Sequence, residues 1–138
     1  MMRLLVSEID TQTHQPTMRV ITRPNDANPK GDIFGGWLMS QIDIAGSITA
    51  QERARGPVST VAVKNLQFLK PLYVHYLASF YTEITAVGHT SITVNIDVYA
   101  KKLYVSLKPK EEAEIIKIAE ATFVYVAVEK PGVKRLLD

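Results

Sequence analysis

The sequence contains no cysteine, and this absence excludes disulfides, thiolate nucleophiles and thiolate metal sites. Its three histidines, His14, His75 and His89, lie too far apart along the chain for a local metal-binding motif. No apolar run approaches the ~20 residues that a membrane-spanning helix requires, and charged residues follow the N-terminus too closely for a signal peptide. These absences predict a cytoplasmic protein without a thiolate or local histidine metal site and without a membrane partner.

An excess of charge of one sign is also missing, because 16 basic and 14 acidic residues give a formal net charge of only +2. No basic block is dense enough to follow a nucleic-acid backbone, so we do not expect nucleic acid as a partner. With 138 residues, 46% of them hydrophobic, the chain is long enough to bury one core. We therefore predict a single domain over residues 1–138.

Turn residues and hydrophobic periodicity predict a short strand and a long helix in the first part of the chain. Residues 1–16 are mixed in character and predict a loose lead-in, and TMRVITRP (17–24) predicts a strand that ends at its proline. The next residues, NDANPKGD, are typical of a loop. Residues 33–54 are too dense in apolar side chains for a surface helix, so they predict one mostly buried helix.

Four long strands are predicted after the helix, because apolar and polar residues alternate from Val58 onward. These strands cover residues 59–71, 76–87, 91–103 and 113–128. One face of the third strand is apolar and consists of Ile92, Val94, Ile96 and Val98. The segment KPKEE (108–112) predicts a polar hairpin turn before the last strand. A single apolar helix ahead of an antiparallel meander predicts an α+β architecture in which the sheet wraps the helix.

One carboxylate, Asp43, lies in the middle of the apolar helix. Ser40, Asp43 and Ser47 are spaced so that they share one narrow stripe of the helix surface. This stripe either faces solvent or a neighbouring subunit, or it places Asp43 in a cleft as a general base or nucleophile. The spacing alone leaves both interpretations open.

Gly35 and Gly36 lie at the start of this helix, where backbone N–H groups lack intrahelical acceptors. Because glycine has no Cβ, a ligand oxygen could approach these N–H groups closely, and the helix dipole favours negative charge there. The pair outlines an oxyanion site. Tight packing or a turn is the more ordinary explanation of two adjacent glycines.

The segment NPKGDIFGGWLMSQIDIAG (28–46), followed by VSTVAVKNLQFLKPL and VGHTSITVNIDVYAKK, resembles the hotdog-fold acyl-CoA thioesterases, in particular the YciA-type short- to medium-chain hydrolases. The resemblance covers about residues 17–128, and N-x-x-G-D-I-F-G-G-W-x-M-S-Q-x-D is its most specific part. It implies a long central helix wrapped by a curled antiparallel β-sheet. It also implies that two subunits form a continuous sheet and that dimers assemble into a trimer of dimers, a homohexamer.

The resemblance implies roles for individual residues. Asp43 matches the catalytic acid, and Asn28 matches the Asn, or His in some relatives, ahead of the glycines. Gly36 matches the glycine whose N–H polarises the thioester carbonyl, and Gly35 lies beside it at the substrate. The implied reaction is hydrolysis of acyl-CoA to free acid and CoA without a cofactor. Asp43 either activates a water or attacks directly to form a transient anhydride.

Other residues are candidates for contacts with CoA. The backbone and hydroxyls of one predicted turn could meet pantetheine or phosphate; this turn comprises Gly88, His89, Thr90 and Ser91. Lys101 and Lys102 could hold CoA phosphates, although a pair of lysines at a strand end is more often a solvated edge. Asn65, at a break in the alternation, either forms a hydrogen bond within the sheet or lies near the neighbouring site of a dimer.

The chain departs from the family pattern at two turns. His75 and Tyr76 stand where relatives often have Gly-Asp, and His89 stands where they often have Arg or Lys. These changes leave the core motif intact but leave the turn geometry and CoA contacts open. We expect His75 and His89 to be surface turn residues, and Trp37 and Phe34 to be core or interface residues.

Two alternative functions are compatible with the same fold. A non-catalytic acyl-CoA-binding or sensor module is one, but a pure binder does not require a carboxylate near a helix N-terminus. A dehydratase is the other, and the chain lacks a suitably placed His near the helix. The preferred acyl chain length is not determined by composition, because side chains from two subunits would form the acyl tunnel.

Overall fold

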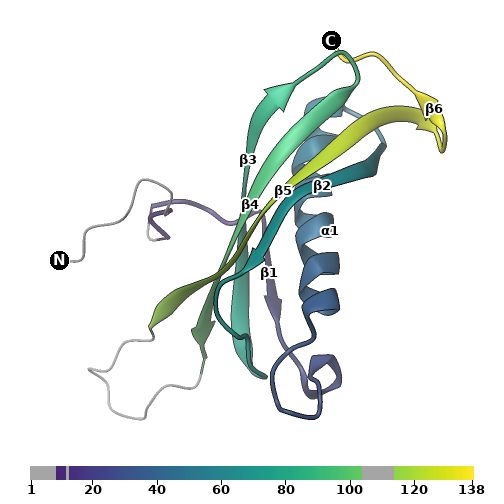
Figure 1. Ribbon diagram of the computed structural model, residues 1–138. Helices are drawn as coiled ribbons and strands as arrows, with labels where there is room; N and C mark the ends of the chain where they lie inside the picture. The colour runs from purple at the N-terminus through teal and green to yellow at the C-terminus, as the bar shows by residue number, and fades with distance from the viewer. Residues whose placement is uncertain (1–8, 12, 104–113) are drawn as a thin grey trace.

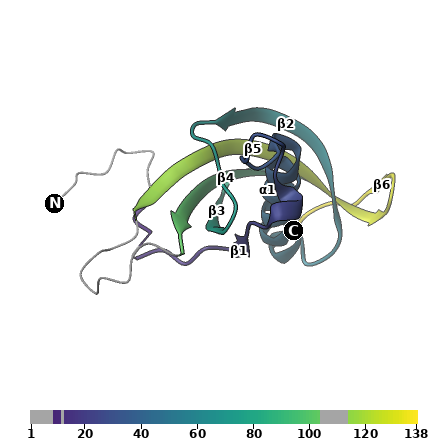
Figure 2. The same cartoon turned by 90° about the horizontal axis from the view of Figure 1, so that it is seen from below.

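One long helix lies in the concave side of a curled antiparallel sheet in the computed structural model of the protein (Figures 1 and 2). The structure describes residues 9–11, 13–103 and 114–138. Helix α1 is Gly35–Ala54, and a short 3-10 helix, η1, precedes it at Pro24–Asp26. The strands are β1 Met18–Ile21, β2 Val58–Phe68, β3 Tyr76–Val87, β4 Ser91–Lys102, β5 Ile115–Lys130 and β6 Val133–Lys134.

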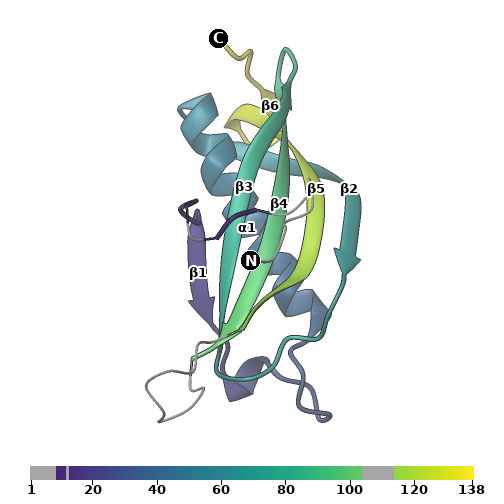
Figure 3. The ribbon, with the colours of Figure 1, turned by 90° about the vertical axis from the view of Figure 1, so that its left-hand side faces the viewer.

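The strand order is β1-β3-β4-β5-β2, with β6 paired to β5, and Figure 3 shows this order across the sheet. Strands β3, β4 and β5 form the predicted antiparallel meander. The meander prediction is wrong for β2, which pairs with β5 at the edge opposite β1. The reason is that residues 69–75 do not form a hairpin. Leu72 in this connection is buried beside the start of the helix, and its carbonyl accepts the Ile33 N–H at 2.7 Å.

The core lies between the sheet and one stripe of the helix. The predicted apolar face of β4 is fully buried at Ile92, Val94, Ile96 and Val98. On the helix the buried residues are Leu38, Ile42, Ala45, Gly46, Ala50 and Ala54. The prediction of a mostly buried helix is wrong for the single chain, because the sheet covers only this stripe. Met39 and Ile44 are 40% and 47% exposed on the remaining surface.

The helix begins two residues later than predicted. Ile33 is bridged to Ala27 in extended backbone, and Phe34 is the N-cap residue with φ −57° and ψ 134°. Phe34 is 51% exposed and does not join the core, whereas Trp37 is half-buried against it. The apolar residues before the helix therefore belong to the loop that leads into it.

The described residues near the two ends of the chain contain a turn in the lead-in and a longer last predicted strand. In the lead-in, the Thr13 and His14 N–H groups donate to Asp10 O at 3.2 and 3.1 Å. Strand β5 continues to Lys130, beyond its predicted end, because the turn at Gly132 (φ +84°) returns the chain into β6. The KPKEE turn and residues 1–8 of the lead-in lie outside the described residues. In the described part of the chain, no helix has the length and apolar character needed to span a membrane.

Candidate active site

The Asp43 carboxylate is half-buried and is held from the neighbouring strand. Thr60 on β2 donates its hydroxyl hydrogen to Asp43 Oδ1 over 2.7 Å. Tyr125, the register partner of Thr60 on β5, donates its hydroxyl hydrogen to the backbone carbonyl of Asp43 over 2.8 Å. Two neighbouring strands thus fix both the side chain and the backbone of this residue.

Asp43 opens onto a pocket of about 270 Å³ between the helix and strands β2 and β5. The pocket is lined by Gly36, Met39, Ser40, Asp43, Thr60, Val63 and Phe123. Gly36 and Asp43 line the same pocket because they are seven residues apart, about two helical turns. The polar stripe of the helix therefore borders a hollow that a small ligand can enter.

The serines of this stripe are hydrogen-bonded to their own helix. Ser40 donates to Trp37 O at 2.8 Å, and Ser47 donates to Ile44 O at 2.7 Å. Asp43 instead accepts a hydrogen bond from another element, and its carboxylate has two oxygens with several acceptor sites. Among the three residues of the stripe, Asp43 is thus the group suited to proton transfer or nucleophilic attack.

The first turn of the helix has backbone N–H groups without intrahelical acceptors. The N-cap Phe34 makes no side-chain hydrogen bond to this turn, and the Leu38 N–H donates to Phe34 O at 3.2 Å. The N–H groups of Gly35 and Gly36 precede that bond. A Cβ built on Gly36 would meet nothing within 4 Å, so the backbone there is open to the pocket.

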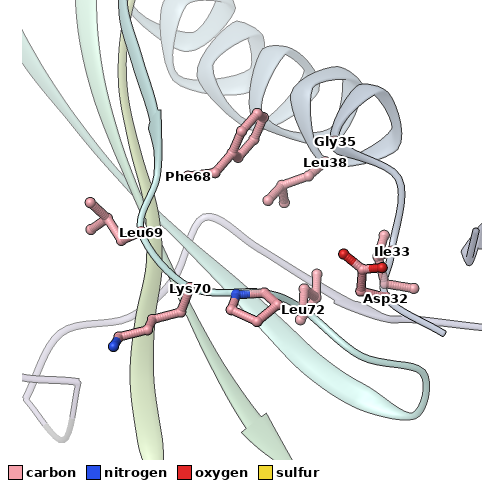
Figure 4. A pocket seen from close by; sticks show the side chains of 9 residues that line it. Asp32, Ile33, Gly35, Leu38, Phe68, Leu69, Lys70 and Leu72 are labelled. Carbon is pink, nitrogen blue, oxygen red and sulfur yellow. The ribbon is translucent and has the colours of Figure 1, made fainter. Parts of the chain in front are cut away.

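Gly35 has different surroundings from Gly36. A Cβ built on Gly35 would lie 3.3 Å from Cε2 of Phe68, so this glycine allows the phenyl ring to pack against the helix start. It also borders a second pocket of about 270 Å³, whose side chains Figure 4 shows. That pocket is lined by Asp32, Ile33, Gly35, Leu38, Phe68, Leu69, Lys70, Pro71 and Leu72. The packing interpretation therefore fits Gly35, whereas Gly36 faces the pocket at Asp43.

Asn28 forms the turn before the helix and does not line the Asp43 pocket of its own chain. Its side-chain Oδ1 accepts the Lys30 N–H at 2.8 Å, and its backbone N–H donates to Asp32 O at 2.8 Å. Gly31 completes the turn with φ +100°, which favours glycine. A single chain does not bring Asn28 and Asp43 together.

The predicted CoA-binding turn lies at the end of the sheet opposite the start of α1 (Figure 1). The Gly88 N–H donates to Ser91 O at 2.8 Å, and Thr90 O accepts the Ala127 N–H at 2.9 Å. His89 is exposed, and its carbonyl accepts the Leu137 N–H at 2.8 Å. His75 is also an exposed turn residue, as predicted, with φ 68°. Within one chain, the turn at residues 88–91 and Gly36 therefore lie at opposite ends of the molecule.

Asn65 and Lys101 lie on the sheet face that points away from the helix. Asn65 is opposite Thr122, while its neighbour Leu66 packs against the core. A register shift between Val63 and Asn65 explains the break in alternation. Lys101 lies beside the buried Ala100 and lines a separate small pocket on the outer face, and Lys102 is exposed at the strand end. Neither Asn65 nor Lys101 lines the Asp43 pocket.

Thr60 and Tyr125 are the residues of this arrangement that the sequence did not reveal. Each has the residue type and alternation expected of any strand position, and their approach to Asp43 depends on the pairing of β2 with β5. The described residues contain no group of three or more His, Asp or Glu side chains that could hold a metal ion. The polar groups that line the pocket are the Asp43 carboxylate and the hydroxyls of Ser40 and Thr60, beside the backbone of Gly36.

A family model described as the thioesterase superfamily matches residues 30–106, from the turn before α1 to beyond the end of β4. The chain belongs to the thioesterase superfamily. This thioesterase is also 43% identical to the acyl-CoA thioester hydrolase YciA of Salmonella typhimurium, over 93% of each chain. The predicted membership in the YciA-type acyl-CoA thioester hydrolases is thereby confirmed.

Solved structures confirm the predicted fold of the thioesterase. A hexameric thioesterase from Yersinia pestis superposes with a TM-score of 0.82 at 42% identity, covering 91% of this chain and 97% of that chain. A hexameric hotdog-fold thioesterase of Campylobacter jejuni gives a TM-score of 0.81 at 33% identity, with 91% of both chains covered. The helix and curled sheet described above are therefore a hotdog fold.

Proposed function

We propose that this thioesterase hydrolyses short- to medium-chain acyl-CoA to free acid and CoA at the pocket shared by Gly36 and Asp43. The observation that carries the proposal is the opening of a helix-start N–H and a carboxylate onto one pocket. Thioester hydrolysis requires a donor for the carbonyl oxygen and a base or nucleophile near the carbonyl carbon. Gly36 and Asp43 would supply these two functions.

Gly36 would act on the thioester carbonyl through its backbone N–H. Negative charge develops on the carbonyl oxygen as the tetrahedral intermediate forms. A free N–H at a helix start stabilises this charge both by a hydrogen bond and through the positive end of the helix dipole. The open space above Gly36 lets the carbonyl oxygen approach the N–H closely.

Asp43 would act on the carbonyl carbon by one of two routes. As a general base it takes a proton from water, the hydroxide attacks the carbon, and the carbon–sulfur bond breaks as the CoA thiolate leaves. As a nucleophile it forms a mixed anhydride with loss of CoA, and water then releases the acid. In both routes Thr60 keeps one carboxylate oxygen engaged while the other faces the acyl group.

We also propose that two chains complete each site by forming a continuous sheet through β2, and that three such dimers form a hexamer. Strand β2 ends the sheet of the single chain, and a long unpaired edge is a template for pairing with another strand. Val63 on β2 and Met39 on α1 are exposed and line the Asp43 pocket, and Val61 and Phe68 are exposed on the same strand. The hexameric state of the Yersinia and Campylobacter proteins supports this arrangement. Asn28 of one chain would then approach Asp43 of the other.

The test is thiol release from acyl-CoA substrates of increasing chain length, measured for the wild-type protein and Asp43→Asn. We expect turnover by the wild type. In the variant, kcat should be lower by about a hundredfold or more, and the substrate should still bind. Glu52→Gln removes an exposed carboxylate from the same helix and should leave activity unchanged. Near-normal turnover in Asp43→Asn would contradict the role of Asp43. Binding of acyl-CoA without turnover by the wild type would support the non-catalytic module instead.

A further inference from the structure

Tyr125 reaches the middle of the helix through a gap that a glycine leaves. The Tyr125 side chain is fully buried, and a Cβ built on Gly46 would overlap its hydroxyl oxygen. The same Cβ would lie 3.0 Å from Cζ of Tyr125 and 3.1 Å from Cδ1 of Ile96, both tighter than most packing contacts of a Cβ. Gly46 is therefore required for the phenol to approach the helix backbone.

The phenol uses this gap to hydrogen-bond the residue that carries the carboxylate. Tyr125 Oη donates to Asp43 O over 2.8 Å. A carbonyl inside a helix already accepts the N–H four residues later, and its second lone pair is free for another donor. The helix does not need the Tyr125 bond for its own ladder, so the bond serves to fix this turn of α1 to β5.

The Tyr125 bond and the Thr60 bond come from one cross-strand pair. Thr60 and Tyr125 are direct register partners on β2 and β5, and they hold the carboxylate and the carbonyl of Asp43 respectively. Burial raises the pKa of the Tyr125 phenol above its ordinary value, and the negative charge of Asp43 raises it further. The phenol therefore stays protonated and able to donate throughout the neutral range.

We propose that Tyr125, seated in the gap at Gly46, is a positioning residue for the Asp43 carboxylate. Tyr125 does not line the pocket at Asp43, so it acts through Asp43 and not on the substrate. Its hydrogen bond fixes the rotation of this helix turn and its distance from β5. The rotation and the distance determine the position of the carboxylate relative to Gly36. The inference rests on the proposed function of Asp43.

The first experiment compares Tyr125→Phe with Tyr81→Phe in the assembled enzyme. Tyr81 is also buried, but it lies on β3 opposite Asp97, on the sheet face away from the helix. We expect Tyr125→Phe to lower kcat about tenfold with little change in KM, and Tyr81→Phe to leave both unchanged. A wild-type kcat in Tyr125→Phe, an equal loss in the two variants, or a loss confined to KM would overturn the proposal. A lower melting temperature without a lower kcat would also overturn it, because it indicates a purely structural role.

The second experiment tests the pairing of Tyr125 with Gly46. Gly46→Ala should displace the phenol and lower kcat at least as much as Tyr125→Phe does. The double variant Gly46→Ala/Tyr125→Phe lacks the phenol oxygen that the added methyl would overlap. Its fold-loss in kcat should therefore be smaller than the product of the fold-losses in the two single variants. Losses that multiply would mean that the two residues act independently. If Gly46→Ala does not fold, the comparison of Tyr125→Phe with Tyr81→Phe decides the matter.

Asp43→Asn, measured in parallel, separates failure of this inference from failure of the proposed function. Full activity in Asp43→Asn removes the catalytic role of Asp43, whatever Tyr125→Phe does. An inactive Asp43→Asn together with a fully active Tyr125→Phe leaves the proposed function standing and overturns only the positioning role.

Discussion

Thr60 and Asp43 join strand β2 to helix α1 through a hydrogen bond of 2.7 Å between Thr60 Oγ1 and Asp43 Oδ1. The bond is charge-assisted when the carboxylate is ionised, and such bonds are stronger than those between neutral groups. It restricts the rotation of a side chain that otherwise lies beside the apolar Met39 and Val63. The relationship leads directly to a prediction for Thr60.

Thr60→Val should lower kcat about tenfold, because valine keeps the shape and the strand propensity of threonine but removes the donor. Thr60→Ser keeps the hydroxyl and should retain most of the activity. Ser59→Ala is a matched control on the same strand, since Ser59 is the neighbouring residue opposite Val126 and does not line the pocket. Steady-state kinetics with one acyl-CoA substrate test the series. Equal kcat values for Thr60→Val and the wild type would show that the bond does not matter for turnover.

Gly36→Ala should stabilise the protein while reducing its activity. The added methyl meets no protein atom within 4 Å, and alanine is favoured over glycine in a helix by about 0.5–1 kcal/mol. The same methyl enters the pocket where the thioester carbonyl would bind, so kcat/KM should fall at least tenfold. Thermal melting and thiol release measure the two effects.

Ser47→Ala is the control for Gly36→Ala. Ser47 lies on the same stripe of the helix but does not line the pocket, so its replacement should leave kcat/KM unchanged. Unchanged kcat/KM in Gly36→Ala as well would mean that the N–H of Gly36 is not near the reacting carbonyl.

Asp97 on the outer face of the sheet should make stability depend on pH. Burial raises the pKa of its carboxyl above the ordinary 3.8, even though Lys117 Nζ lies 3.2 Å from Oδ1. A raised pKa in the folded state means a contribution to stability that is present at low pH and is lost as pH rises through that pKa. The free energy of unfolding of Asp97→Asn relative to wild type should therefore increase as pH rises from the ordinary value of 3.8 through the raised pKa.

Urea unfolding at fixed protein concentration measures the Asp97 effect, because assembly makes stability depend on concentration. Glu52→Gln, at an exposed position, should show no such trend. A relative stability of Asp97→Asn that falls as pH rises would mean that the attraction of Lys117 outweighs the cost of burial.

Local patterns in the sequence are sufficient to predict most helices and strands and to single out two residues of the candidate site, Asp43 and Gly36. Strand β3 has the predicted bounds, and the apolar face of β4 is buried as predicted, because alternation reports which face is covered. A carboxylate within an apolar helix and glycines at the start of that helix made Asp43 and Gly36 candidates, and the family resemblance implied their roles. Their spacing of seven residues places them on one side of the helix, whereas the pocket at that side also requires residues of β2 and β5.

The remaining features depend on pairings that local sequence does not encode. Thr60 approaches Asp43 only because β2 pairs with β5 and not with β3. Asn65 points away from the helix because of a register shift, and such a shift reverses the face of every later residue. The exposed side of α1 has the apolar density of a buried helix, which is the pattern expected if another chain covers it.

Asn28 and Asp43 belong to one site only if two chains meet there. Within one chain Asn28 shapes the turn before α1 and does not line the pocket at Asp43. The family resemblance nevertheless assigns both residues to the reaction. An arrangement in which Asn28 of one chain reaches Asp43 of the other would reconcile the geometry of one chain with the roles that the resemblance implies, and mixing inactive variants tests it.

Asn28→Ala and Asp43→Ala should each be inactive as homo-oligomers, because loss of an oxyanion-type donor costs about 3 kcal/mol and loss of the base costs as much or more. When the two are mixed and reassembled, about half of the dimers should contain one chain of each kind. Each mixed dimer has one intact site out of two, so about a quarter of wild-type activity should return. Mass spectrometry verifies that mixed oligomers form, and the unmixed parents set the background. Verified mixed oligomers that stay as inactive as their parents would mean that each site takes both residues from one chain, or that one of the two residues has no role in turnover.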